Sequence, residues 1–167
     1  MSVTAEMVKS LRKITSAGMM ECKRALVDSN GDIEKATELL RKKGAASAEK
    51  KAGRIATEGK IVQKISPDTR HGVLLEVNCE TDFVARTDDF KELCHNLAMQ
   101  IAAMSPIYIN ADEIPDDEKR SPEELALTSQ AYIRDPAVSV SDLILEAAGK
   151  LGENVKIKRF SRFALGE

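Results

Sequence analysis

Apolar residues recur at helical spacing in the first 45 residues of the chain, in three short segments. Met7, Leu11 and Ile14 are four and three residues apart, so they share one face of a helix that Thr4 can cap. A second segment covers residues 19–26, after a break at Ser-Ala-Gly. Because helices this short are not stable alone, they are expected to pack together as a small bundle.

The third helical segment starts at Asp32, which is a suitable N-cap. Its apolar face comprises Ile33, Ala36, Leu39 and Leu40. Gly44 stands where a C-cap glycine would end the helix, and residues rich in alanine and lysine follow it. We therefore expect a three-helix module over residues 1–45 and a basic, helix-prone linker over residues 46–59.

Strand patterns begin at residue 60. Residues 60–66 and 72–78 flank a turn-rich segment and predict a β-hairpin. A periodic helix follows, beginning near Thr87 and stopped by Pro106. Its apolar face comprises Phe90, Cys94, Leu97, Ile101 and Met104.

The last third of the chain contains an acidic connection, residues 110–124, with short strands expected at residues 107–109 and 130–133. A helix is expected after Ser139 or Ser141, ending at Gly152. Residues 60–167 are therefore predicted to form an α+β core, in which helices pack on an antiparallel sheet.

The final strand is expected over residues 154–165, where Val155 and Ile157 alternate with lysines. Phe160 breaks this alternation. A β-bulge near Arg159 would restore it for Phe163 and Leu165.

Composition argues against several classes of protein. Aromatic residues make up 4% of the chain and Trp is absent, so aliphatic side chains must fill the core. The net charge of −2 argues against direct nucleic-acid binding as the main role. The three cysteines are scattered, which disfavours a zinc site or a disulfide framework and indicates reduced thiols in a cytoplasmic protein. No apolar run is long enough to span a bilayer, and the N-terminus has no apolar signal region.

The sequence shows no arrangement of a nucleophile and a base that is typical of an enzyme active site. His71 falls in a predicted turn and His95 beside the apolar stripe of a helix, so both are expected at the surface. Neither a GxxxxGK[ST] phosphate loop nor a GxGxxG motif is present. We therefore expect a binding protein that is no enzyme and needs no cofactor or metal of its own.

Two segments are candidates for contact with a partner. Met19 and Met20 cannot both face one core, because successive helical residues point about 100° apart. They either straddle the edge of the bundle core or lie exposed on a binding surface, where methionine is common. The stretch CETDFVART, residues 79–87, places an acid and Phe83 at the exit of a strand. Phe83 is either folded back into the core or held out for a partner.

ITSAGMMECKRAL and EVNCETDFVAR resemble the two signature stretches of the bacterial elongation factor Ts family, and GENVKIKRFSRF is similar to that family's C-terminal strand. The resemblance implies a guanine-nucleotide exchange factor that binds the GTPase elongation factor Tu and promotes its GDP release in translation elongation. The architecture it implies is a ubiquitin-associated-like three-helix module, a linker and an α+β core.

The resemblance also assigns roles to two sets of residues. The tip that enters the GTPase beside its magnesium site would comprise Thr81, Asp82, Phe83 and Val84. Phe83 would wedge between helices of the partner, and Asp82 would disturb the network around Mg²⁺. The helical module would dock on another face of the GTPase through Arg12, Met19 and Met20, with Lys23 nearby.

The chain departs from the family pattern in two ways. It has room for one core subdomain, so it resembles the short members that pair as homodimers, and it lacks a helical stretch that these carry before QAYIRDPAVSV. An alternative is a protein-binding adaptor that has a ubiquitin-associated-like module and no exchange activity. RNA binding through the basic linker is a third interpretation, and an enzyme is the last.

Overall fold

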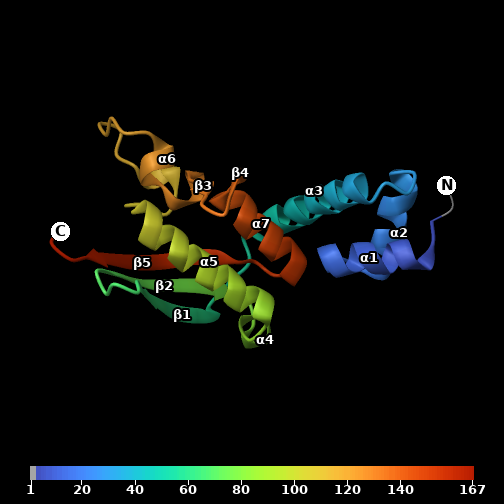
Figure 1. Ribbon diagram of the computed structural model, residues 1–167, viewed down its shortest axis with the longest axis horizontal. Coiled ribbons are helices and arrows are strands. Elements are labelled where there is room, and N and C mark those ends of the chain that lie inside the picture. The colour runs from blue at the N-terminus through green and yellow to red at the C-terminus, as the bar shows by residue number, and fades with distance from the viewer. Residues whose placement is uncertain (1–2) are drawn as a thin grey trace.

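Three helices open the chain in the computed structural model, which describes residues 3–167 (Figure 1). They are α1 (Ala5–Thr15), α2 (Met19–Asp28) and α3 (Ile33–Lys51). Both predicted N-caps are confirmed: Met7 N donates to Thr4 Oγ1 at 3.3 Å, and Lys35 N donates to Asp32 Oδ1 at 3.0 Å. The helices share a small core of Val8, Leu11, Cys22, Ala25, Leu26, Ala36 and Leu40.

The buried face of α1 differs from the predicted one at its C-terminal end. Val8 and Leu11 are buried and Met7 packs against them, whereas Ile14 is exposed. Ile14 lies in the last turn, next to Ser16, where the backbone turns to a left-handed φ of 54° and leaves the helix. Its side chain lines a groove that faces α7 (Val140–Leu151) and is not part of the bundle core.

The predicted helix end at Gly44 is wrong, because α3 runs on for two more turns to Lys51. Gly44 lies where α3 crosses α7, against Gly149. A Cβ placed on Gly149 would come within 2.8 Å of the Gly44 backbone, so glycine permits the close approach of the two helices.

Helix α3 belongs to two cores. Ala36 and Leu40 pack in the helical module, and Ala48 packs in the core of the second part of the chain. The expected boundary between residues 45 and 46 therefore falls inside one continuous helix. Only residues 52–57 connect α3 to the first strand.

The second part of the chain is built on a three-stranded antiparallel sheet in the order β1-β2-β5. The strands are β1 (Glu58–Ile65), β2 (His71–Cys79) and β5 (Lys156–Ala164), so the predicted hairpin and final strand are confirmed. Helix α5 (Asp88–Met104) covers one face of the sheet, and α7 packs against α5 and α3 (Figure 1). Val73, Leu75 and Val77 point into this core, which confirms the predicted α+β fold.

The β-bulge predicted in the final strand is present, but its effect on the side chains differs. Val77 pairs with Ile157 and Glu76 pairs with Arg159, so Lys158 is the extra residue. This insertion turns Phe160 toward the core beside Ile157. Phe163 and Leu165 consequently lie exposed on the opposite side, where the expected alternation had placed core residues.

Short elements complete the core: α4 (Asp82–Ala85), η1 (Ala111–Glu113), α6 (Pro122–Leu125), η2 (Leu127–Ser129), β3 (Ala131–Tyr132) and β4 (Asp135–Ser139). The strand expected at residues 107–109 is reduced to an isolated bridge between Tyr108 and Ala126. Of the two serines proposed as the cap of the last helix, Ser139 holds that position, because Asp142 N donates to its Oγ at 3.0 Å. Gly152 ends the helix as predicted.

Candidate functional site

Phe83 lies on a single helical turn, α4, that projects where β2 ends. Its side chain is 81% exposed, while Ala85 in the same turn is buried and Val84 packs against the core. Thr81 caps the turn, because Val84 N donates to its Oγ1 at 3.3 Å. The turn therefore directs Phe83 outward, and the interpretation that placed Phe83 in the core is wrong.

Hydrogen bonds of Thr87 and Cys79 hold the two ends of this tip on the core. Thr87 Oγ1 donates to Val84 O at 2.7 Å and accepts from Phe90 N at 3.3 Å, so one side chain ends α4 and begins α5. Phe90 is fully buried just beyond. On the other side, Cys79 Sγ donates to Thr81 O at 3.2 Å. The tip thus presents an exposed aromatic side chain on an ordered backbone.

Asp82 lies beside Phe83 at the surface of the same turn. Its Oδ2 accepts a hydrogen bond from Arg86 Nη2 at 2.7 Å, and both side chains are more than half exposed. The two residues are four apart, the spacing at which side chains meet on a helix. Arg86 was not predicted from the sequence, although its position four residues after Asp82 is a signal for this pair. An exposed pair of this kind contributes little to stability and can be exchanged for a partner's groups.

The candidate docking residues of the helical module lie at one end of its bundle. Met19 is 52% exposed and Met20 is 61% exposed, because α2 buries Cys22, Ala25 and Leu26 instead. Lys23 follows Met19 by four residues and Met20 by three, so it extends the same side of the helix. Arg12 is exposed in the last turn of α1. Their exposure fits the binding-surface interpretation of the methionines.

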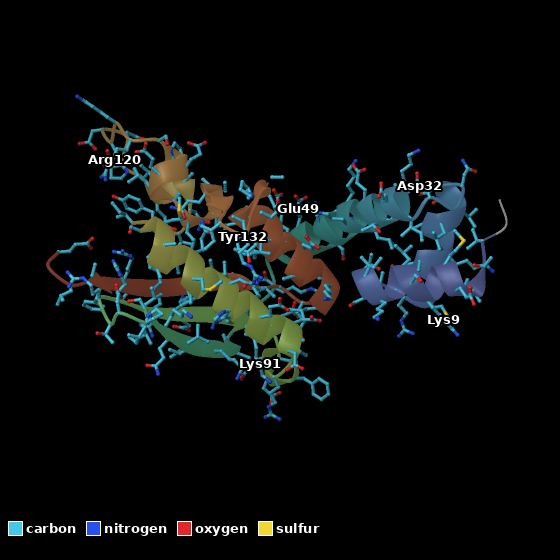
Figure 2. All side chains as sticks on the ribbon, viewed as in Figure 1. Lys9, Asp32, Glu49, Lys91, Arg120 and Tyr132 are labelled. Carbon is cyan, nitrogen blue, oxygen red and sulfur yellow. The ribbon has the colours of Figure 1, made fainter. Side chains whose placement is uncertain are left out.

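The two candidate surfaces belong to different parts of the molecule. The helical module projects from the core on α3, and α4 lies at the lower edge of the core in the view of Figure 1. In Figure 2, Lys9 marks α1 and Lys91 marks the first turn of α5, next to the tip. A partner in contact with both surfaces would have to span the helical module and the core.

Two of the three cysteines are poor candidates for nucleophilic chemistry. Burial raises the pKa of Cys94 to about 12 and also raises the pKa of Cys79, so both thiols stay protonated at neutral pH. His95 is exposed, as expected, whereas His71 is half-buried and is the first residue of β2 instead of part of the preceding turn. Within residues 3–167, His, Cys, Asp and Glu side chains form no group of three that could hold a metal ion. No helix in that range is long and apolar enough to cross a bilayer.

The fold defines an α+β protein in which a three-helix module is joined to a core built on an antiparallel sheet. The family model described as "Elongation factor TS" matches residues 3–123. The elongation factor Ts of Syntrophomonas wolfei is 48% identical over 195 residues, covering 99% of this chain and 91% of that protein. That of Thermotoga neapolitana is 47% identical, covering 100% and 99%. The chain belongs to the elongation factor Ts family and is a translation elongation factor.

The relatives are longer than this chain. The alignment with the T. neapolitana protein runs over 195 positions and includes the whole of this 167-residue chain, so at least 28 positions are gaps here. The elongation factor Ts of Prochlorococcus marinus, 48% identical, aligns over 197 residues. A length difference of this size is large enough for the helical stretch that the sequence analysis expects to be absent before QAYIRDPAVSV, which stays a prediction.

Proposed function

We propose that this chain is a guanine-nucleotide exchange factor that binds elongation factor Tu and accelerates its release of GDP. The observation that carries the proposal is the exposed Phe83 beside Asp82 on a capped, ordered tip. A large aromatic side chain held away from its own core loses stabilisation unless a partner covers it. The family membership and the resemblance of this stretch to the family signature support elongation factor Tu as that partner.

The tip would act on the metal site of the GTPase. Phe83 wedges between helices of the partner, and the Asp82 carboxylate disturbs the water and side-chain network around Mg²⁺. Because Mg²⁺ is the main neutraliser of the nucleotide phosphates, its displacement weakens GDP binding. No covalent bond is made or broken, and the exchange factor needs no cofactor of its own.

The helical module would supply affinity through a second contact. Met19 and Met20 bury their exposed side chains on the GTPase, and Arg12 and Lys23 surround them with positive charge. By linkage, the exchange factor weakens the nucleotide as much as the nucleotide weakens the exchange factor. Each ~1.4 kcal/mol of that coupling changes the affinity about tenfold.

The test is the release of fluorescent GDP from elongation factor Tu with and without this chain. We expect the release rate to rise with the concentration of the chain and then to saturate. Binding without faster release would favour the adaptor interpretation. A matched measurement with RNA as competitor, at low and high salt, would reveal a role for the basic residues, since nucleic-acid binding weakens steeply with salt.

We further propose that two copies pair through the outer face of the sheet, and that the protein acts in the cytoplasm. That face carries exposed apolar side chains from all three strands: Ile61, Ile65, Leu74 and Phe163. Contiguous exposed apolar side chains usually mark an interface. The register places Ile65 and Phe163 on either side of Gly72, so their side chains can join across the sheet. A symmetric homodimer is the simplest assembly that covers both copies of this face.

A further inference from the structure

Glu153 holds the base of the tip from the far end of the chain. Its Oε2 accepts from the backbone N–H groups of Glu80 and Thr81, both at 3.0 Å, and its Oε1 accepts from Thr81 Oγ1 at 2.6 Å. Hydrogen bonds to a carboxylate are stronger than those between neutral groups. Thr81 in turn caps α4, so the Glu153 carboxylate fixes the residue from which the turn bearing Phe83 starts.

The neighbouring residue returns the contact. Asn154 N donates to Glu80 Oε1 at 2.7 Å. The segment after β2 and the segment before β5 therefore each donate a backbone N–H to a carboxylate of the other. The Asn154 side chain also donates to Ala52 O at 3.1 Å and to Arg54 O at 2.7 Å, which ties in the segment after α3. Asn154 is buried and Glu153 is half-buried. The hydrogen bonds of Asn154 and the one from Glu80 N are partly shielded from water, whereas the two from Thr81 are exposed.

The position of Glu153 depends on the end of α7. Gly152 adopts a left-handed φ of 75° and its N–H donates to Ala148 O at 2.9 Å, which ends the helix and turns the chain toward β2. A residue 72 positions away in sequence thereby becomes the direct neighbour of Thr81. Neither Glu153 nor Asn154 was singled out as a site residue from the sequence.

We infer that Glu153 is a positioning residue for nucleotide exchange. It orders the tip in the free protein, so that no conformational entropy of the tip has to be lost when Phe83 and Asp82 enter the partner. This inference rests on the proposed exchange function. A mobile tip would have to be ordered when it enters the partner, and the free-energy cost of that ordering would offset part of the contact energy. Glu153 itself would act through Thr81 and Glu80 and not through contact with the nucleotide site.

The first experiment compares Glu153→Ala, Glu153→Gln and Glu146→Ala in GDP release from elongation factor Tu. Glu146 is a carboxylate on α7 that pairs with Arg41 at 3.6 Å, away from the tip, and serves as the matched control. For Glu153→Ala we expect the maximal release rate to fall about tenfold, which corresponds to about 1.4 kcal/mol. The half-saturating concentration should change little, since the helical module still docks.

This split separates positioning from loss of folded protein. An unfolded fraction would raise the apparent half-saturating concentration and leave the maximal rate unchanged. Glu153→Gln should restore most of the maximal rate, because one amide oxygen can accept both backbone N–H groups. An unchanged maximal rate for Glu153→Ala, or a Gln variant as slow as the Ala variant, would overturn the inference.

A second experiment reads the tip without the partner. The chain has no Trp, so Phe83→Trp introduces a single Trp at the tip, which can be excited apart from the two tyrosines. Adding Glu153→Ala should lower the time-resolved anisotropy of that Trp, which reports motion on the nanosecond scale, and Glu146→Ala should leave it unchanged. If the anisotropy falls in Glu153→Ala but the unmodified chain does not accelerate GDP release, Glu153 orders the tip and the exchange proposal is wrong. A Trp that stays equally ordered overturns the role of Glu153 whatever the exchange result.

Discussion

Phe83 and Phe90 are seven residues apart on either side of Thr87, and they lie in opposite environments. Phe90 is fully buried in the core, and Phe83 is 81% exposed on the tip. Thr87 separates them by bonding backward to Val84 O and forward to Phe90 N. Substitution of Phe90 therefore tests the contribution of a buried aromatic side chain to stability, and substitution of Phe83 tests the contribution of an exposed one to partner binding.

Phe83→Ala should leave the thermal unfolding temperature nearly unchanged and abolish most of the acceleration of GDP release. Little buried area is lost, but the wedge for the partner is removed. Phe90→Ala is the matched control and should cost about 3–5 kcal/mol of folding free energy, the usual cavity penalty for a buried Phe. Thermal melting and nucleotide release on both variants give the answer. A large drop in melting temperature for Phe83→Ala would contradict the proposed wedge.

Asp82→Ala should keep binding to elongation factor Tu and shrink the Mg²⁺-dependent part of the acceleration. The variant keeps Phe83 and loses the carboxylate, together with an exposed ion pair to Arg86 that contributes about 0–1 kcal/mol. GDP release at high and low free Mg²⁺ isolates this part. Asp88→Ala removes a similar exposed pair, with Lys91 at 3.2 Å, and should have no such effect. Equal loss in the two variants would argue for a general charge effect.

Changing Met19 and Met20 together to Ala should weaken the complex by about 2–3 kcal/mol, since both side chains are expected to be buried by the partner. Melting should show a fold that largely survives, because both side chains are mostly exposed in the free chain. Leu26→Ala, in the same helix but fully buried, should instead destabilise the module by about 2–5 kcal/mol. Titration of labelled elongation factor Tu measures the affinity. Unfolding of the double variant would return the methionines to the bundle core.

Gly149→Ala should destabilise the protein by about 1–3 kcal/mol, because the new methyl group meets the backbone of Gly44 in a closely packed crossing. Gly44→Ala is the matched control at the same crossing. There the added Cβ would lie 3.8 Å from Gly149, an ordinary contact, and alanine favours the helix by up to about 1 kcal/mol. Chemical denaturation of both variants measures the difference. Equal stability of the two would mean that α3 and α7 separate freely.

Light scattering at micromolar concentration should show a dimer, and Phe163→Asp should convert it to a monomer by placing a charge on the outer face of the sheet. Val27→Asp changes an exposed apolar residue on α2, outside the sheet, and should leave the assembly unchanged. A monomeric unmodified chain would rule out the proposed pairing.

The sequence by itself determined the features that depend on neighbouring residues. Thr4 and Asp32 cap their helices because each side chain reaches an N–H three residues ahead. The hairpin of β1 and β2 and the end of α7 at Gly152 follow from equally local signals. The family signature also marked the tip, since its residues are contiguous.

The tertiary structure alone decided the features that depend on distant partners. Gly44 is typical of a helix end, but Gly149, more than a hundred residues later, packs against it where α3 crosses α7. The side on which Phe163 emerges follows from the bulge at Lys158 opposite β2, and the ordering of the tip follows from Glu153. Local propensity differs by about 1 kcal/mol per residue or less. Packing contacts and hydrogen bonds to carboxylates contribute more than that, so they set the final conformation wherever the two compete.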